Sequence, residues 1–395
     1  MKITAPPEHI ASILEKITSE GFDAFLVGGC VRDTVMGRAI HDWDLATSAA
    51  PVDVARLFSK TILTGEKFGT VSIVLPDCTV EVTTFRTEGE YQDGRRPKNV
   101  EFVTSLEDDL SRRDFTINAM AVSIEGKLID PYGGIKDIQA GIIRCVGGPN
   151  TRFSEDALRM FRALRLAAEL GFEIEPDTLQ AIYANAGMAA RISTERIRIE
   201  MEKTLMSKRP EITGEMIMVG LLERYMIISG KRPDGLEKIA ELPFDAKLRW
   251  CAFVALLSER RYISSAADLL NDLHLDSKTV KTCLRALTIE NFPDDRTGIK
   301  RLLSNYDIDA VRCSASASDI IKGGCALSST DEIIASGECI EMRDLALSGS
   351  DLIELGYPPG RELGDTLKKL LEYVLENPEC NERDTLLGLV ETGNL

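Results

Sequence analysis

Hydrophobic positions near the start of the chain change from the period of a helix to that of a strand. Apolar residues recur at helical spacing over 9–20, which predicts an amphipathic helix. They are Ile10, Ile13, Leu14 and Ile17. The apolar run 25–27 predicts a buried strand, because Gly28 and Gly29 end it abruptly. Helix and strand patterns that alternate in this way predict a mixed α/β domain.

Both patterns continue through the first hundred residues. Helical spacing predicts short helices over 31–37 and 51–58. Strand-like alternation over 71–75 and 79–84, on either side of a Pro-Asp pair, predicts a β-hairpin. The next segment, 86–98, is polar and charged and has no periodicity, which is typical of a mobile loop.

From residue 151 onward the apolar spacing is almost wholly helical. The predicted fold class is therefore an α/β head followed by an all-α neck, body and tail. The predicted boundaries are 1–148 for the head, 149–206 for the neck, 207–320 for the body and 321–395 for the tail.

Two acidic residues follow the glycine turn closely. Asp42 and Asp44 would lie on one face if 42–46 is a strand, because strand side chains alternate. Mg²⁺ binds a few carboxylate oxygens and takes its other ligands from water and substrate phosphates. Gly29 would let backbone amides approach a triphosphate, and Arg32 would neutralise it. An isolated Asp-x-Asp among 63 acidic residues is typical of solvated surface, but the upstream glycine turn and Arg32 favour a metal and phosphate site.

Two neighbouring residues leave alternatives open. Glu81, in the second strand of the predicted hairpin, lies either on a solvated face or at the metal site as a third acid. His41 either supports the acidic pair or belongs to the local structure alone. The chain has three histidines, which excludes a histidine-rich metal centre.

The composition indicates the class of protein and its cellular location. Apolar content of 44% and charged content of 28% are those of an ordinary globular protein. The longest apolar run, 251–257, is too short to cross a bilayer, and the N-terminus has no signal-peptide pattern. Nine cysteines without a C-x-x-C pair favour reduced thiols over disulfides or a zinc site. We therefore expect a cytoplasmic protein without a membrane segment.

The net charge of −16, taken alone, argues against a nucleic-acid substrate. The basic residues nevertheless cluster in the first half, which predicts a basic cleft in an acidic exterior, with salt-sensitive phosphate binding. The clustered residues are Arg95, Arg96, Lys98, Arg112, Arg113, Arg159, Arg162 and Arg165.

A second polar cluster lies on the predicted helix 155–165. The core stripe of this helix is Leu158, Phe161, Leu164 and Ala168. Polar residues at a spacing of three wind around an adjacent face. They are Asp156, Arg159, Arg162 and Arg165. By itself this pattern is typical of a solvated helix face with an Asp156–Arg159 ion pair.

The chemistry of the nucleobases gives this cluster a sharper interpretation. Cytosine and adenine each present an amino donor beside a ring-nitrogen acceptor, so an Asp and an Arg together satisfy both bases. Uracil and guanine present a carbonyl oxygen beside an N–H. The carboxylate of the Asp would then face the carbonyl oxygen and the guanidinium of the Arg would face the N–H, so neither hydrogen bond would form. Bidentate contacts of this kind discriminate by about 1–3 kcal/mol. Asp156 and Arg159 could thus select C and A without a nucleic-acid template.

Four stretches together resemble the motifs of one enzyme family. They are GGCVRD at 28–33, DWDLATS at 42–48, RRDFTINA at 112–119 and the EDxxR pattern at 155–159. The chain resembles class II tRNA nucleotidyltransferases, the CCA-adding enzymes and bacterial poly(A) polymerases, whose head is similar to that of DNA polymerase β. The resemblance covers nearly the whole chain and is greatest to the short bacterial CCA-adding enzymes.

The resemblance implies that C, C and A are added to the 3′ end of tRNA from CTP and ATP, with release of pyrophosphate. The catalytic acids it implies are Asp42, Asp44 and Glu81, with Mg²⁺ on the first two. The nucleotide-binding residues it implies are Gly29, Arg32, Arg113, Asp156, Arg159, Arg162 and Arg165.

Other parts of the resemblance leave alternatives open. Asp114 and Asn118 would either bind the ribose or hold the head together. Arg196, in a neck motif, is expected to brace the template helix. The tail would receive tRNA, with Lys368 and Lys369 either contacting its backbone or lying on a solvated helix face.

Enzymes with related activities have the same head domain. Poly(A) polymerases usually carry a basic C-terminal extension, CC-adding enzymes lack the loop found at 86–98, and A-adding enzymes are the hardest to separate. A non-catalytic RNA-binding protein of the same fold is the alternative of another class, and the intact acidic pair argues against it. The sequence leaves open whether the chain acts alone or as a homodimer.

Overall fold

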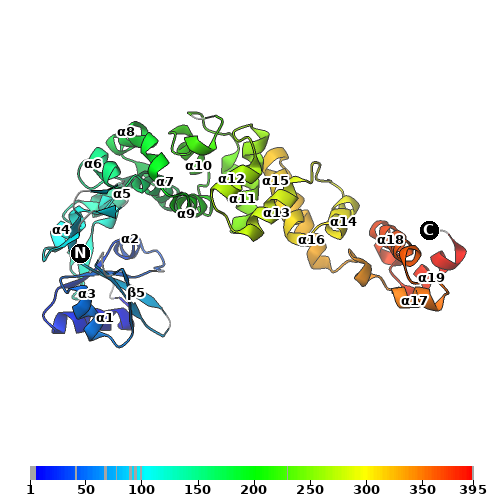
Figure 1. Ribbon diagram of the computed structural model, residues 1–395, viewed down its shortest axis with the longest axis horizontal. Helices are drawn as coiled ribbons and strands as arrows, with labels where there is room; N and C mark the ends of the chain where they lie inside the picture. The colour runs from blue at the N-terminus through cyan, green and yellow to red at the C-terminus, as the bar shows by residue number, and fades with distance from the viewer. Residues whose placement is uncertain are drawn as a thin grey trace. The chain divides into compact units, whose positions relative to one another are not determined.

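The computed structural model describes residues 6–40, 42–65, 69–76, 78–88, 91–92, 96–97, 100–228 and 230–393. The chain divides into two compact units (Figure 1). The first comprises Met1–Arg224 and Ser229–Arg232, and the second comprises Tyr225–Ile228 and Pro233–Leu395.

A mixed β-sheet is the centre of the first unit. Within the described residues it has seven strands in the order β11-β10-β1-β2-β5-β4-β3. The strands are β1 (Ala24–Val27), β2 (Asp44–Thr47), β3 (Thr61–Gly65), β4 (Thr70–Val74), β5 (Thr79–Thr84), β10 (Ala121–Ser123) and β11 (Leu128–Ile129). β2 and β5 are parallel neighbours, and the other neighbouring pairs are antiparallel.

Helices cover both faces of this sheet because strand side chains alternate between two cores. Leu26 and Leu45 face the core that includes residues of α1 (Glu8–Ser19), α2 (Gly29–Val35) and α3 (Pro51–Leu57). Their neighbours, such as Val27 and Ala46, face a smaller core with α4 (Leu106–Ser111). Figure 1 shows α1 and α3 together beside the sheet.

The remainder of the first unit is mostly helical. Its helices are α5 (Gly134–Ala140), α6 (Pro149–Glu155), α7 (Leu158–Leu170), α8 (Pro176–Asn185), α9 (Thr194–Leu205) and α10 (Ile212–Met218). Its 3₁₀ helices are η2 (Thr116–Asn118), η3 (Ala186–Arg191) and η4 (Glu223–Tyr225). Two short parallel strands, β12 (Ile142–Ile143) and β13 (Glu173–Ile174), pair beside them.

The second unit is helical throughout the part that the structure describes. Its helices are α11 (Ala246–Glu259), α12 (Ala266–Asp272), α13 (Ser277–Leu287), α14 (Arg296–Asn305), α15 (Ile308–Lys322), α16 (Ala326–Ser336), α17 (Gly349–Glu354), α18 (Arg361–Glu376) and α19 (Arg383–Thr392). Its 3₁₀ helices are η5 (Leu236–Glu241), η6 (Met342–Asp344) and η7 (Pro378–Cys380). α11 is buried over most of its length and packs on α13 and α15.

The predicted α/β head with a helical remainder is confirmed, with three local corrections. The predicted loop 86–98 contains β6 (Arg86–Glu88), which pairs with β9 (Val100–Phe102). It also contains β7 (Tyr91–Gln92), paired with β8 (Arg96–Pro97). The rest of this segment, with Arg95 and Lys98, lies outside the described residues. β3 and β13 are further strands that the apolar pattern does not predict.

In the described part of the chain, no helix is long and apolar enough to cross a membrane. All nine cysteines are free thiols, and six of them are buried. The longest apolar run lies within α11, where it fills the core of the second unit.

An ion pair with one buried partner ties α14 to the residues that follow α16. Glu338 accepts a hydrogen bond from Arg296 and pairs with Lys300, whose side chain is 2% exposed. The hydrogen bond from Arg296 is the largest cause that lowers the pKa of Glu338, from 4.5 to about 2. Because the folded-state pKa is lowered, this pair stabilises the fold above pH 4.5, and its contribution disappears as the pH falls towards 2.

Glu338→Gln is therefore expected to lower the free energy of unfolding by about 2 kcal/mol at pH 7, because it leaves the buried Lys300 ammonium group without its charged partner. The difference between variant and wild type should close as the pH falls from 4.5 towards 2. Urea unfolding over this pH range measures both effects. Glu332→Gln, a substitution at an exposed position of α16, is the control. If the difference in free energy of unfolding between Glu338→Gln and wild type stays constant with pH, the role given to Glu338 is wrong.

Candidate active site

The acidic pair lies where β2 begins, beside β5. β2 starts at Asp44, so the predicted strand 42–46 is corrected: Asp42 precedes the strand and is exposed. Asp44 is half-buried and lies opposite Glu81 in the parallel register of β2 and β5. Neighbouring residues in register point to the same face of a sheet, so Glu81 shares the face of Asp44. His41 lies outside the described residues.

The charges of Asp42 and Glu81 both act on the Asp44 carboxylate. Burial is the main cause that raises the pKa of Asp44, and the charges of Glu81 and Asp42 raise it further. Arg113 is the chief group that opposes this shift. Like charges gathered at one place favour a bound cation.

Gly28 permits the close approach that this site requires. Its φ is +75°, a left-handed conformation that favours glycine. A Cβ atom at this position would lie 3.2 Å from Arg113 Nη1 and 3.5 Å from Asp44 Oδ2. Sequence reasoning assigned the close approach to Gly29, but Gly29 is the first residue of α2 and lies against Arg32.

Arg113 is held against this turn by a buried acid. Asp109, fully buried, accepts from Arg113 Nη2 at 3.1 Å and from Arg112 Nη2 at 2.6 Å. Although burial raises the pKa of Asp109, the charges of Arg113 and Arg112 bring it below its usual value. Arg113 Nε is buried and has no hydrogen-bond partner. An unpartnered guanidinium N–H beside an acidic pair is suited to an incoming phosphate oxygen.

The donor set fits a divalent cation that is shared with a nucleotide. Carboxylate oxygens from β2 and β5 are hard ligands of the type that Mg²⁺ prefers. In the described ranges, however, no three His, Cys, Asp or Glu side chains converge closely enough to hold an ion by themselves. An ion here would therefore complete its coordination with water and triphosphate oxygens, as Mg²⁺ commonly does.

Arg32 is 9% exposed and is engaged by two residues of the head. Its Nε and Nη2 donate to the two carboxylate oxygens of Asp33 at 3.0 and 2.9 Å. Its Nη1 donates to Asn118 Oδ1 at 2.8 Å. These contacts hold the guanidinium group beside the glycine turn.

Asp156 lies at a break between two helices, which corrects the single helix predicted over 155–165. Its backbone is extended (φ −142°, ψ 104°), between the end of α6 and the start of α7. The Asp156 carboxylate accepts from the N–H of Leu158 at 3.0 Å and from Arg196 Nη2 at 2.6 Å. Arg196 on α9 therefore braces Asp156, as the neck motif leads one to expect.

Arg159 and Arg165 on α7 are both 8% exposed, so they do not lie on a solvated face. Arg159 pairs with Glu155 and donates to the carbonyl oxygen of Arg112 at 3.0 Å. Arg165 bonds Glu200 of α9 at 2.5 Å. The alternative Asp156–Arg159 surface pair is thus replaced by pairs with Arg196 and Glu155.

The predicted core stripe of α7 is buried. Arg162, on the same helix, donates to Asp114 Oδ2 from Nε at 2.8 Å and lies 2.6 Å from it through Nη2. Although burial raises the pKa of Asp114, the Arg162 charge holds it well below its usual range. Arg112, Asp114, Arg159 and Arg162 thus connect the head to α7.

Sequence reasoning missed Gly28 and Asp109. The spacing of Asp109 to Arg112 and Arg113, three and four residues, is that of facing residues on a helix and could have revealed it. The positive φ of Gly28 has no comparable signal in the sequence.

Comparison with known proteins gives consistent matches. The Poly A polymerase head domain matches residues 24–144, and the probable RNA and SrmB-binding site of polymerase A matches 171–225. A CCA-adding enzyme of Limosilactobacillus fermentum is 37% identical over 395 residues, 98% of each chain. One of Bacillus velezensis is 37% identical over 381 residues, 94% of each chain.

Among solved structures, the Bacillus stearothermophilus CCA-adding enzyme in complex with CTP is 33% identical, with a TM-score of 0.76. The match covers 99% of this chain and 98% of that one. The head-domain match and these relatives define a nucleotidyltransferase. This chain is an enzyme of that class, and it belongs to the family of CCA-adding enzymes.

Proposed function

We propose that this chain adds C, C and A in turn to the 3′ end of tRNA, using CTP and ATP and releasing pyrophosphate. The observation that carries the proposal is the joining of two sites in one unit. Asp44 of β2 interacts electrostatically with Arg113. The carbonyl oxygen of Arg112, the residue before Arg113, accepts a hydrogen bond from Arg159 of α7 at 3.0 Å. The proposed phosphate-binding and base-reading residues are thus connected through the backbone of 112–113.

The proposed reaction is attack of the tRNA 3′-hydroxyl on the α-phosphate of the bound nucleotide. Asp42 and Asp44 would hold Mg²⁺, with Glu81 on the same sheet face, and this ion would supply Lewis-acid activation and neutralise charge. Arg113 would donate to the triphosphate, and Arg32 would add positive charge next to the Gly29 turn. Most of the catalysis is then positioning and electrostatic stabilisation.

Base selection is assigned to Asp156 and Arg159. Asp156 accepts from the amino group common to cytosine and adenine, and Arg159 donates to the adjacent ring nitrogen. Arg196 fixes the orientation of the Asp156 carboxylate, which supports a precise hydrogen-bonding role. Arg162 and Arg165 would complete the nucleotide-binding side of α7, through Asp114 and Glu200 respectively.

The tail, 321–395, is proposed to receive tRNA. Lys368 and Lys369 are exposed on α18, where their positive charges would face a phosphate backbone. The free thiols and the tRNA substrate support a cytoplasmic location.

Incorporation assays test the proposal. Purified protein should transfer labelled CMP to tRNA that lacks CCA when CTP is present, and the transfer should stop when EDTA removes divalent cations. Restoring Mg²⁺ should restore it. UTP and GTP should give little product. No transfer from CTP with Mg²⁺ present would refute the proposed function.

A further inference from the structure

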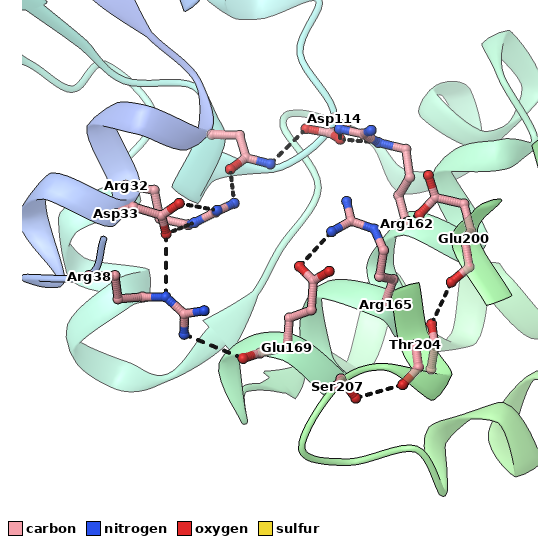
Figure 2. A network of polar contacts seen from close by, with 11 residues as sticks. Arg32, Asp33, Arg38, Asp114, Arg162, Arg165, Glu169, Glu200, Thr204 and Ser207 are labelled. Atoms are coloured by element: carbon pink, nitrogen blue, oxygen red, sulfur yellow. Dashed lines mark hydrogen bonds and ion pairs between the residues drawn. The ribbon is translucent and has the colours of Figure 1, made fainter. Parts of the chain in front are cut away.

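Asn118 is a neutral residue in the polar network that crosses from the glycine turn to α7. The residue is 7% exposed, and both ends of its amide make hydrogen bonds. Oδ1 accepts from Arg32 Nη1 at 2.8 Å, and Nδ2 donates to Asp114 Oδ1 at 3.3 Å. Figure 2 shows Arg32, Asp114 and Arg162 in this network.

An amide can make both contacts, because its oxygen accepts and its nitrogen donates. A carboxylate would accept from Arg32 but would repel Asp114, and an apolar side chain would remove one hydrogen bond from each partner, leaving Arg32 with Asp33 and Asp114 with Arg162. A buried polar group that loses its partner costs about 1–3 kcal/mol. The chemistry of Asn118 is therefore matched to a cation on one side and an anion on the other.

The network joins the two ends of the proposed nucleotide site. Arg32 lies beside the glycine turn, and Asp33 holds it from the other side. Asp114 is bonded by Arg162, which lies one helical turn after Arg159 on α7. A change at Asn118 thus breaks the bridge from Arg32 to Asp114 and α7, although Asn118 belongs to neither α2 nor α7.

A second tie between the same elements leads back to Asp33. Arg38, which follows α2, lies 3.6 Å from Asp33 and donates to the carbonyl oxygen of Glu169 at 3.4 Å. Glu169 is in the last turn of α7. Two ties, one towards each end of α7, therefore converge on the Arg32–Asp33 pair (Figure 2).

We propose that Asn118 is a positioning residue for the incoming nucleotide. By bridging Arg32 and Asp114 it fixes the spacing between the triphosphate side of the site and the base-reading residues at the start of α7. This inference rests on the proposed function, and it assigns Asn118 to holding the site together rather than to contacting the ribose.

The test is a double-mutant cycle at positions 118 and 114. Asn118→Asp places two carboxylates together and should raise KM for both CTP and ATP about tenfold, with a smaller effect on kcat. Adding Asp114→Asn relieves the repulsion between the two carboxylates, so part of the loss should be recovered even though Arg162 loses its charged partner. Asn185→Ala, which removes an asparagine hydrogen bond between α8 and α6, is the matched control and should leave KM unchanged.

Deoxynucleotides separate positioning from ribose contact. If Asn118 positions other residues, the ratio of CTP to dCTP efficiency should be the same in the variant and in the wild type. A ratio that shifts towards dCTP would overturn the proposal and assign Asn118 to the ribose. Unchanged KM values, or no recovery in the double variant, would also overturn it.

Two controls keep the outcome clear. If Asn118→Asp does not fold, Asn118→Ala removes both hydrogen bonds without adding charge, and the same KM and deoxynucleotide comparisons apply. Wild-type protein is assayed in parallel. If the wild type does not incorporate CMP from CTP, the proposed function is wrong. If the wild type is active and the variant has the same KM values, only the inference about Asn118 is wrong.

Discussion

Asp44→Asn is expected to abolish addition of both C and A, with kcat reduced by about a thousandfold or more. The substitution keeps the size of the side chain but removes the charge that lies among Asp42, Glu81 and Arg113. Single-turnover incorporation measures the chemical step. tRNA binding, followed by gel shift, should remain near that of the wild type, because the proposal assigns tRNA binding to the tail.

Comparison variants sharpen this result. Asp42→Asn should behave like Asp44→Asn, and Glu81→Gln should have a smaller effect if that residue is an auxiliary acid. Glu125→Gln, between β10 and β11 and away from β2, is the control and should have no effect. Near-normal turnover in Asp44→Asn would show that the cation does not depend on this carboxylate.

Asp156→Ala is expected to change which nucleotide is accepted. Loss of the acceptor should raise UTP incorporation relative to CTP by about ten- to a hundredfold, the range of one bidentate base contact. The measurement is kcat/KM for each of the four nucleotides on one tRNA.

Two further variants separate recognition from folding. Arg196→Gln removes the brace of Asp156 and should shift selectivity in the same direction but by less, because the carboxylate remains. Asp177→Ala, an exposed change in the first turn of α8, should leave selectivity unchanged. Equal losses with every nucleotide in Asp156→Ala would mean that this residue supports the helix break and does not read bases.

Periodic elements with one buried face could be predicted closely. α1, α3 and the β4–β5 hairpin have the expected positions, because their apolar spacing alone specifies the face that packs. β3, in contrast, is an edge strand with Ile62 and Leu63 exposed, so its side chains do not alternate clearly between core and solvent.

The candidate site also has parts that the sequence could predict and parts that it could not. The acidic pair and the arginines could be proposed from the sequence because local spacing and known motifs mark them. The helix break at Asp156 could not, since it is accompanied by a bond to Arg196, 40 residues further along the chain. The bridge made by Asn118 depends likewise on Arg32, 86 residues away. Tertiary contacts of this kind leave no periodic signal.

Product length on three tRNA substrates is the most direct test of the central claim, CCA addition. With tRNA lacking CCA, CTP alone should add two residues, ATP alone should add none, and both together should add three and then stop. tRNA ending in C should gain C and A, and tRNA ending in CC should gain A. Addition of A only to the CC end would identify an A-adding enzyme, and continued extension with ATP would identify a poly(A) polymerase; either result would contradict the account.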